Sequence, residues 1–187
     1  NCIFRAIVGA RVVPPVRLPR SRYACIKRSG MWNELNQKFV CIYIKCKNTQ
    51  TPVLMNTLIN GIHHVTSLAS DTQRNVDFYV GILGLRMVKK TINFDAPDVY
   101  HLYYGDEVGS PGSILTFFPY TGLSRGRKGG GQLTYTAFSI AAGSLNYWID
   151  RLTQFNIPFS GPYVRFNENY LRFEDYDGMG VELVANS

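Results

Sequence analysis

Cysteine is missing from most of this chain, and long apolar runs are missing from all of it. The four cysteines, Cys2, Cys25, Cys41 and Cys46, all precede Met55. Their spacing is irregular and no histidine lies near them, which argues against a zinc site. No segment approaches the roughly 18 consecutive apolar residues of a transmembrane helix, so we predict no membrane partner. The cysteine-free remainder favours a reducing, cytoplasmic setting.

Acidic residues are nearly absent from the first 54 residues. This segment has ten Lys and Arg residues against Glu34, whereas residues 55–187 have ten basic and twelve acidic residues. The formal charge of +7 therefore belongs to the first segment, and the remainder has no basic stripe for nucleic acid. We predict that residues 1–54, with a strand-like stretch at 39–44, are a disordered or non-native extension and that Met55 is the natural start. A genuine basic arm is the alternative.

Residues 55–187 repeat one pattern of periodicities. The first copy predicts a strand at 62–68, a helix from Ser70 or Asp71 to about residue 83 that Gly84 ends, and strands at 86–94, 99–104 and 113–118. The second copy predicts a strand at 132–140, a helix capped by Ser144 and ended by Asn156 and Pro158, and strands at 163–166, 170–174 and 180–184.

This repeat predicts an α+β domain at residues 55–187 built from two βαβββ modules, 57–120 and 131–187. Each module has one helix, which can cover only one face of its sheet. Pairing two modules is expected to leave a concave sheet cleft, a natural place for a ligand or a metal.

A series of short motifs in this domain resembles a known family. In chain order the motifs lie at residues 61–66, 78–79, 83–85, 88–95, 100–106, 111–113, 116–119, 126–129 and 143–148. Together they are similar to the N-terminal half of ring-cleaving dioxygenases of the vicinal-oxygen-chelate (glyoxalase, bleomycin resistance and extradiol dioxygenase) superfamily, especially those acting on hydroquinones. Members of that family carry four such modules and this chain holds two, so the resemblance implies a chain truncated at Ser187.

The resemblance also implies the chemistry. Such enzymes hold Fe(II), or in some cases Mn(II), with two histidines and one carboxylate, and the open positions take the substrate hydroxyl and O₂. His64 matches the first of these ligands. Thr66 matches a residue that lines the substrate pocket and, two residues on, shares the sheet face of His64. His63 matches a histidine that either supports the metal ligand or contacts the substrate, although strict alternation turns it away from that face.

The remaining ligands are not evident in this sequence. His101 is the only other histidine, and its place within a strand favours a packed or hydrogen-bonded residue. A self-contained triad would have to combine His64 and His101 with Glu182 of the last strand. By the resemblance, the missing ligands come from the absent modules, so we expect this chain alone to be inactive. The alternative is a homo-oligomer in which two such chains associate to complete the cleft.

Three functions stay open at this point. The first is metal-dependent insertion of O₂ into a small hydroquinone- or catechol-like aromatic. The second is a glyoxalase-type metal lyase or isomerase, disfavoured because the strand at 113–118 offers no ligand. The third is a metal-free binding module of the resistance type. The glycine-rich basic stretch at 126–131 does not match a phosphate loop, so we interpret it as the connector between the modules.

Overall fold

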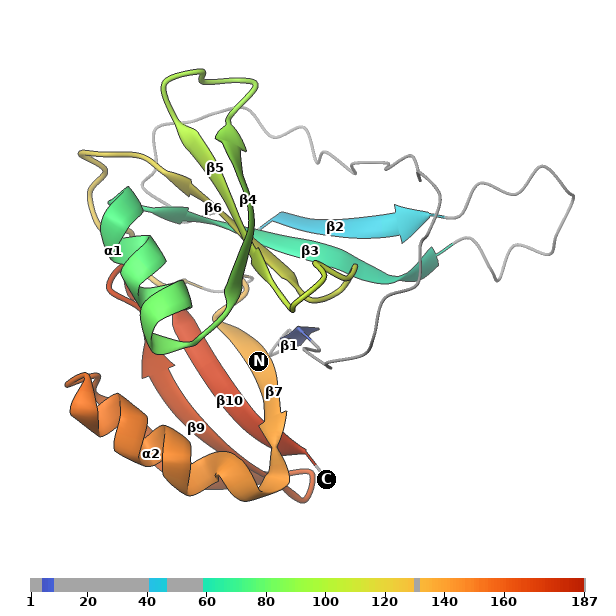
Figure 1. Cartoon of the computed structure of the whole chain (residues 1–187), viewed down its shortest axis with the longest axis vertical. Helices are drawn as coiled ribbons and strands as arrows, with labels where there is room; N and C mark the ends of the chain where they lie inside the picture. Colours follow the sequence, from blue (N-terminus) through green and yellow to red (C-terminus); the bar gives the residue numbers. More distant parts are fainter. Residues whose placement is uncertain (1–4, 9–40, 47–58, 130–131, 187) are drawn as a thin grey trace, which may run out of the picture.

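The computed structural model describes residues 5–8, 41–46, 59–129 and 132–186. Within these ranges lie two five-stranded sheets, one above the other in Figure 1. The first sheet has the strand order β2-β3-β6-β5-β4, and the second has the order β1-β7-β10-β9-β8. The predicted α+β fold of two βαβββ modules is confirmed.

The first module follows its predicted order closely. Its elements are β3 (Ile59–Ala69), α1 (Thr72–Val76) with a π-helical turn at Asp77–Ile82, β4 (Arg86–Ile92), β5 (Tyr100–Gly105) and β6 (Ile114–Pro119). The Asp71 carboxylate accepts a hydrogen bond from the backbone N–H of Arg74 at 2.8 Å, which caps the helix. Gly84 has a φ of 70°, the left-handed conformation that glycine adopts without a Cβ clash. Both predicted ends of this helix are therefore confirmed.

The second module departs from the prediction at its helix cap and at the starts of three strands. Its elements are β7 (Tyr135–Ala141), a 3₁₀ turn (Ala142–Ser144), α2 (Leu145–Gln154), β8 (Phe159–Arg165), β9 (Glu168–Glu174) and β10 (Gly180–Asn186). Ser144 does not cap α2, because its hydroxyl donates to the carbonyl of Ala141 instead. β8 starts at Phe159, four residues earlier than predicted.

One hydrophobic core joins the two modules. Helical residues of the first module contact strand residues of both sheets, and buried members of this core include Val65, Phe78, Tyr79, Ile82, Leu102, Leu115, Leu152, Leu171, Phe173, Val181 and Leu183. The Arg151 guanidinium of α2 donates to the carbonyls of Ile82 at 2.6 Å and Gly81 at 2.7 Å. These bonds satisfy carbonyls at the end of the first helical segment and tie the modules together.

Each sheet turns one face to this shared core and its other face, called here the outer face, away from it. In β3, Val65 lies in the core, so alternation places His64 and Thr66 on the outer face of the first sheet. In β10, Val181 lies in the core, so Glu182 lies on the outer face of the second sheet. The two outer faces are therefore separate surfaces.

Two strands from the predicted extension join these sheets at their edges. β2 (Cys41–Cys46), two residues displaced from the strand-like stretch at 39–44, pairs antiparallel with β3. β1 (Arg5–Val8), which the sequence did not predict, pairs in parallel with β7. The rest of the extension lies outside the described residues, so its assignment as disordered or non-native stays a prediction.

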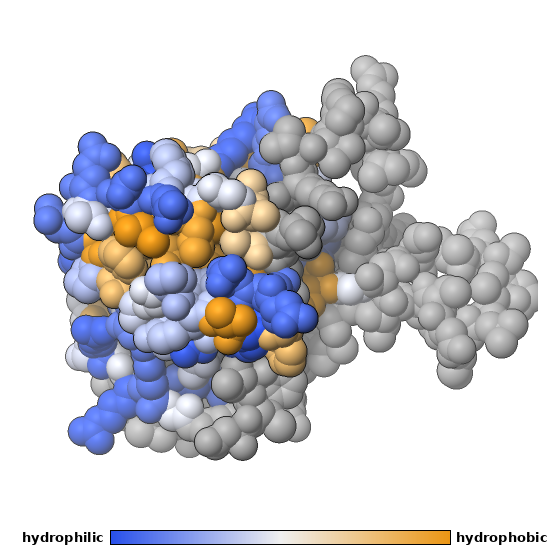
Figure 2. All heavy atoms as spheres, turned by 90° about the horizontal axis from the view of Figure 1, so that it is seen from below, coloured by the Kyte–Doolittle hydropathy of each residue, from blue (hydrophilic) through white to orange (hydrophobic). Residues whose placement is uncertain are grey.

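The surface of the described residues mixes polar and apolar side chains. Seen from below, Figure 2 shows apolar patches in orange that are bordered by hydrophilic side chains in blue. Among the helices that the structure describes, none is both long enough and apolar enough to cross a membrane.

Candidate metal centre

A row of polar side chains crosses the outer face of the first sheet. Strand register places Thr66 of β3 beside Thr116 of β6, Thr116 beside Tyr103 of β5, and Tyr103 beside Lys89 of β4. The hydroxyl oxygens of the buried Thr66 and Thr116 lie 2.7 Å apart, in hydrogen-bond contact. His64, two residues before Thr66, is on the same face. The predicted shared face of His64 and Thr66 is therefore present in the structure.

The imidazoles of His63 and His64 contact each other. Their Nδ1 atoms are 2.8 Å apart and their rings meet edge to face, with centroids separated by 5.1 Å. Alternation alone turns His63 away, but β2 pairs Tyr43 with His64 and Ile44 with Ile62, which leaves His63 as the extra residue of a β-bulge. This local irregularity explains how two successive side chains meet.

The hydrogen bond between the two histidines restricts their tautomers. One Nδ1 must donate and the other must accept. When His64 Nδ1 is the donor, its Nε2 carries the lone pair, which is the arrangement of a metal-ligating histidine oriented by a neighbouring group. His63 would then act by orienting His64.

The surroundings of His64 favour its neutral form. Burial, followed by the nearby His63 and His101, lowers its pKa from 6.5 to about 4. At neutral pH the ring is therefore uncharged, as metal binding requires.

His101 is packed and hydrogen-bonded, as predicted. Its ring lies between Phe118 and Tyr103, with centroid distances of 4.0 and 4.1 Å. His101 Nδ1 is 2.8 Å from the Tyr103 hydroxyl, whereas its buried Nε2 has no hydrogen-bond partner within the described ranges of the chain. Tyr103 was not predicted as a site residue, although the alternation of residues 101–104 could have shown that His101 and Tyr103 share a face.

Glu182 is bound within the second sheet. It is 2% exposed, and its carboxylate accepts hydrogen bonds from Arg165 and, at 2.8 Å, from Arg172. Both guanidinium groups also lie over the Tyr170 ring, at 4.5 and 5.1 Å. The carboxylate is therefore occupied by an internal ion pair, on a different outer face from that of His64.

The described residues do not complete a metal site. No group of three or more His, Cys, Asp or Glu side chains among them is placed to hold a metal ion. The self-contained triad of His64, His101 and Glu182 is therefore not assembled in this part of the chain. Of the three ligands that the resemblance implies, only His64 has a suitable position and protonation state.

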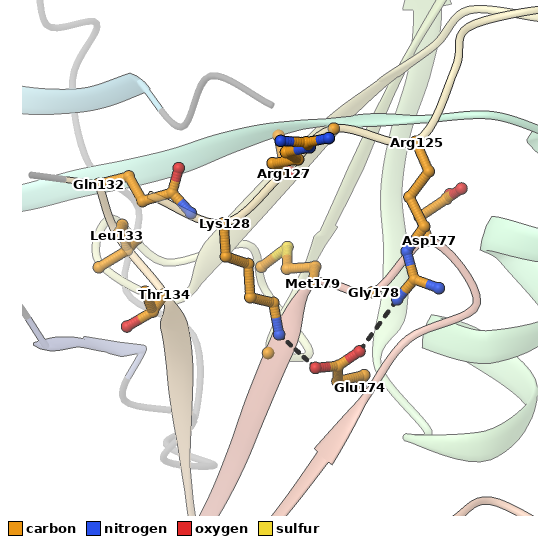
Figure 3. Close-up of a pocket in the computed structure, with 13 residues that line it drawn as sticks. Arg125, Arg127, Lys128, Gln132, Leu133, Thr134, Glu174, Asp177, Gly178 and Met179 are labelled. Atoms are coloured by element: carbon orange, nitrogen blue, oxygen red, sulfur yellow. Dashed lines mark hydrogen bonds and ion pairs between the residues drawn. The ribbon is translucent and has the colours of Figure 1, made fainter. Parts of the chain in front are cut away.

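A cavity of about 300 Å³ lies elsewhere, between the modules (Figure 3). It is lined by the connector that follows β6, the turn between β9 and β10, and Ser67. Arg125 and Lys128 of the connector both pair with Glu174, as the dashed lines in Figure 3 show. The glycine-rich stretch thus joins the modules, as interpreted from the sequence.

Comparison with known proteins assigns the family. The model of the glyoxalase/bleomycin resistance protein/dioxygenase superfamily matches residues 61–183. The chain therefore belongs to this superfamily, in agreement with the resemblance found in its motifs. A glyoxalase/dioxygenase from Nostoc punctiforme shares the fold, with a TM-score of 0.57 at 20% identity over 75% of this chain and 99% of the other.

Nearer relatives carry more specific names. The chain is 47% identical over 124 residues to MhqO of Bacillus subtilis, whose name assigns it to the ring-cleaving dioxygenases, covering 66% of this chain and 39% of MhqO. It is 38% identical over 129 residues to a chlorohydroquinone/hydroquinone 1,2-dioxygenase of Sphingobium indicum, covering 67% and 40%. A crystal structure described as a Bacillus subtilis dioxygenase matches with a TM-score of 0.65 at 46% identity, covering 68% and 41%. The chain thus spans about two fifths of the length of these relatives.

Proposed function

We propose that this chain is part of a metal-dependent dioxygenase that cleaves the ring of a hydroquinone- or catechol-like aromatic. The observation that carries the proposal is the hydrogen bond between His63 and His64 on the polar outer face, which can present a neutral imidazole as a ligand. The relatives named for ring cleavage support the same reaction. The proposed metal is Fe(II), with Mn(II) as the second choice.

Each of three residues has a separate role in this proposal. His64 is the metal ligand, and His63 fixes its tautomer and lies near the substrate. The Thr66 hydroxyl, held by Thr116, contacts the bound ring. The metal supplies electron transfer from the electron-rich ring to O₂, and both oxygen atoms enter the product, so no external reductant is needed.

Because the described residues hold only one suitable ligand, we propose that the other two come from residues beyond them. In that case the chain by itself binds the metal weakly and does not turn over substrate. A cytoplasmic location and a homo-oligomer stay predictions from the sequence.

The test is a titration of the full chain with Mn(II), followed by the NMR signals of its histidine rings, and a measurement of O₂ uptake with Fe(II) and hydroquinone. We expect Mn(II) to broaden the His64 signals first and O₂ uptake to be absent. A His64→Ala variant should lose the metal response, whereas the matched His101→Asn control should keep it.

Two results would contradict the proposal. Ring cleavage by the chain alone would show that its site is complete. Hydroquinone binding that neither a chelator nor His64→Ala alters, together with no metal response, would instead indicate the metal-free binding module.

A further inference from the structure

His101 occupies a place that an apolar ring would fill. Its imidazole packs against the tilted rings of Phe118 and Tyr103, and its buried Nε2 has no hydrogen-bond partner among the residues that the structure describes. An unpaired polar atom in such a position lowers stability, so it calls for a compensating role. His101 Nδ1 is hydrogen-bonded to the hydroxyl of Tyr103, at 2.8 Å.

Two neutral groups make this bond, and the tautomer of His101 sets its direction. Burial raises the pKa of Tyr103, so its phenol keeps its proton. Burial, followed by Lys89, lowers the pKa of His101 to about 4, so its ring is neutral. When the hydrogen of His101 resides on Nε2, Tyr103 donates to His101 Nδ1 and the Tyr103 oxygen keeps its lone pairs for another donor. This is the tautomer that the inference below requires.

Tyr103 lies at the centre of the polar row. In register, Thr116 and Thr66 are on one side of it and Lys89 on the other, with the Lys89 ammonium 5.6 Å from the centre of the Tyr103 ring. β6 separates β5 from β3, so the backbones at Tyr103 and Thr66 are roughly 10 Å apart. A flat ring lying along this row would have one edge near β3 and the opposite edge near Tyr103.

We propose that Tyr103, held by His101, recognises the second oxygen of a para-diphenol by accepting a hydrogen bond from its hydroxyl, with the Lys89 ammonium beside it. This inference rests on the proposed function, because it places the first oxygen near His64. His101 is a positioning residue: it fixes the hydroxyl hydrogen of Tyr103 and so makes the tyrosine an acceptor. Two adjacent oxygens, as in a catechol, would both lie near β3 and leave Tyr103 unused.

An acceptor at Tyr103 distinguishes a hydroxyl from a methoxy group. Hydroquinone offers an O–H at the second position, whereas 4-methoxyphenol offers none and leaves the tyrosine oxygen without a partner. A site that hydrogen-bonds a substrate hydroxyl rejects the analogue that lacks it. We expect hydroquinone to bind about tenfold more tightly than 4-methoxyphenol, because a tenfold ratio of dissociation constants corresponds to the free energy of about one hydrogen bond.

The experiment measures the dissociation constants of hydroquinone and 4-methoxyphenol for the full chain by NMR titration. His101→Phe keeps the stacked ring but releases the Tyr103 hydrogen, so the preference should fall to about twofold or less. The variant Tyr103→Phe should also lose the preference for hydroquinone over 4-methoxyphenol. His101→Asn places an amide oxygen near the position of Nδ1 and should retain most of the preference, a rescue that packing alone does not explain.

The outcomes separate this inference from the proposed function. A wild-type preference that persists in His101→Phe and Tyr103→Phe would overturn the role of these residues, while binding that is sensitive to His64→Ala would leave the proposed function intact. If His101→Phe did not fold, Tyr103→Phe would decide the question. If the wild-type chain bound neither phenol, the inference would fail, because it requires Tyr103 to hold the second oxygen in this chain. A metal response that depends on His64 would then still support the proposed function.

Discussion

The two modules have the same fold but opposite chemistry on their outer faces. The first sheet presents neutral hydrogen-bonding groups, among them His64, Thr66 and Tyr103. The second sheet presents Glu182, which is already paired with two arginines. A repeated fold therefore provides two similar surfaces, and the side chains decide which of them can receive a ligand.

This difference has an energetic basis. Neutral imidazole, hydroxyl and phenol groups can exchange their partners for a substrate or a metal at little cost. A buried carboxylate between two guanidinium groups cannot, because losing one partner leaves a charge uncompensated. The first outer face thus suits binding, whereas the second suits stability.

The largest expected effect tests the second face. Replacing Glu182 by Gln leaves Arg165 and Arg172 without their anion and should destabilise the chain by about 3 kcal/mol, near the lower end for a buried pair because both guanidinium groups are partly exposed. His64→Gln on the first face should cost less than about 1 kcal/mol. Urea unfolding of the two variants checks this contrast, and equal losses would remove the proposed division between the faces.

A second prediction concerns the contact between the modules. The Tyr79 hydroxyl donates to the buried Asp175 carboxylate at 2.9 Å, from the first module to the second. Tyr79→Phe removes this bond and should cost about 1–2 kcal/mol. Because the modules share one core, hydrogen exchange should rise in both sheets. A rise confined to one sheet would show that the modules unfold separately.

Much of this comparison could be predicted from the sequence, but not all of it. The repeat, the cap at Asp71, the helix end at Gly84 and the common face of His64 and Thr66 depend on local patterns, and the structure bears them out. Periodicity cannot state which face of a strand packs on the neighbouring module.

The features that could not be predicted from the sequence depend on the register between residues far apart in the chain. Glu182 reaches Arg172 only because β10 pairs with β9 in one register, and the bulge at His63 arises where β2 lies against β3. No local pattern specifies either pairing. Both the Glu182–Arg172 contact and the bulge at His63 exist only once the sheets are assembled.

The third prediction uses pH to separate the faces. All three histidines of the chain lie in the first module. Burial lowers the pKa of His64 and of His101 to about 4 in the folded chain, against 6.5 for an unperturbed histidine. The unfolded chain therefore binds more protons below pH 6.5, so the stability from these groups is complete above pH 6.5 and is lost as the pH falls towards 4.

A double variant, His64→Gln with His101→Asn, tests this assignment. Its unfolding free energy should fall less steeply between pH 6.5 and 4 than that of the wild type. Partial exposure of both rings should keep the difference below the effect of Glu182→Gln. If the unfolding free energies of the wild type and the double variant fell in parallel with pH, the histidines would not contribute. Carboxylates, which both modules contain, would then cause the whole loss of stability.

The smallest effect is expected at the connector, where the charges are exposed. Arg125 and Lys128 pair with Glu174, but their side chains remain 69% and 47% exposed and that of Glu174 42%. Water and salt screen such pairs, so Glu174→Gln should change stability by less than about 0.5 kcal/mol. The matched substitution Glu182→Gln makes the same chemical change in a buried setting. If Glu174→Gln lowered the stability as much as Glu182→Gln, the connector, rather than burial of the second outer face, would hold the second module in place.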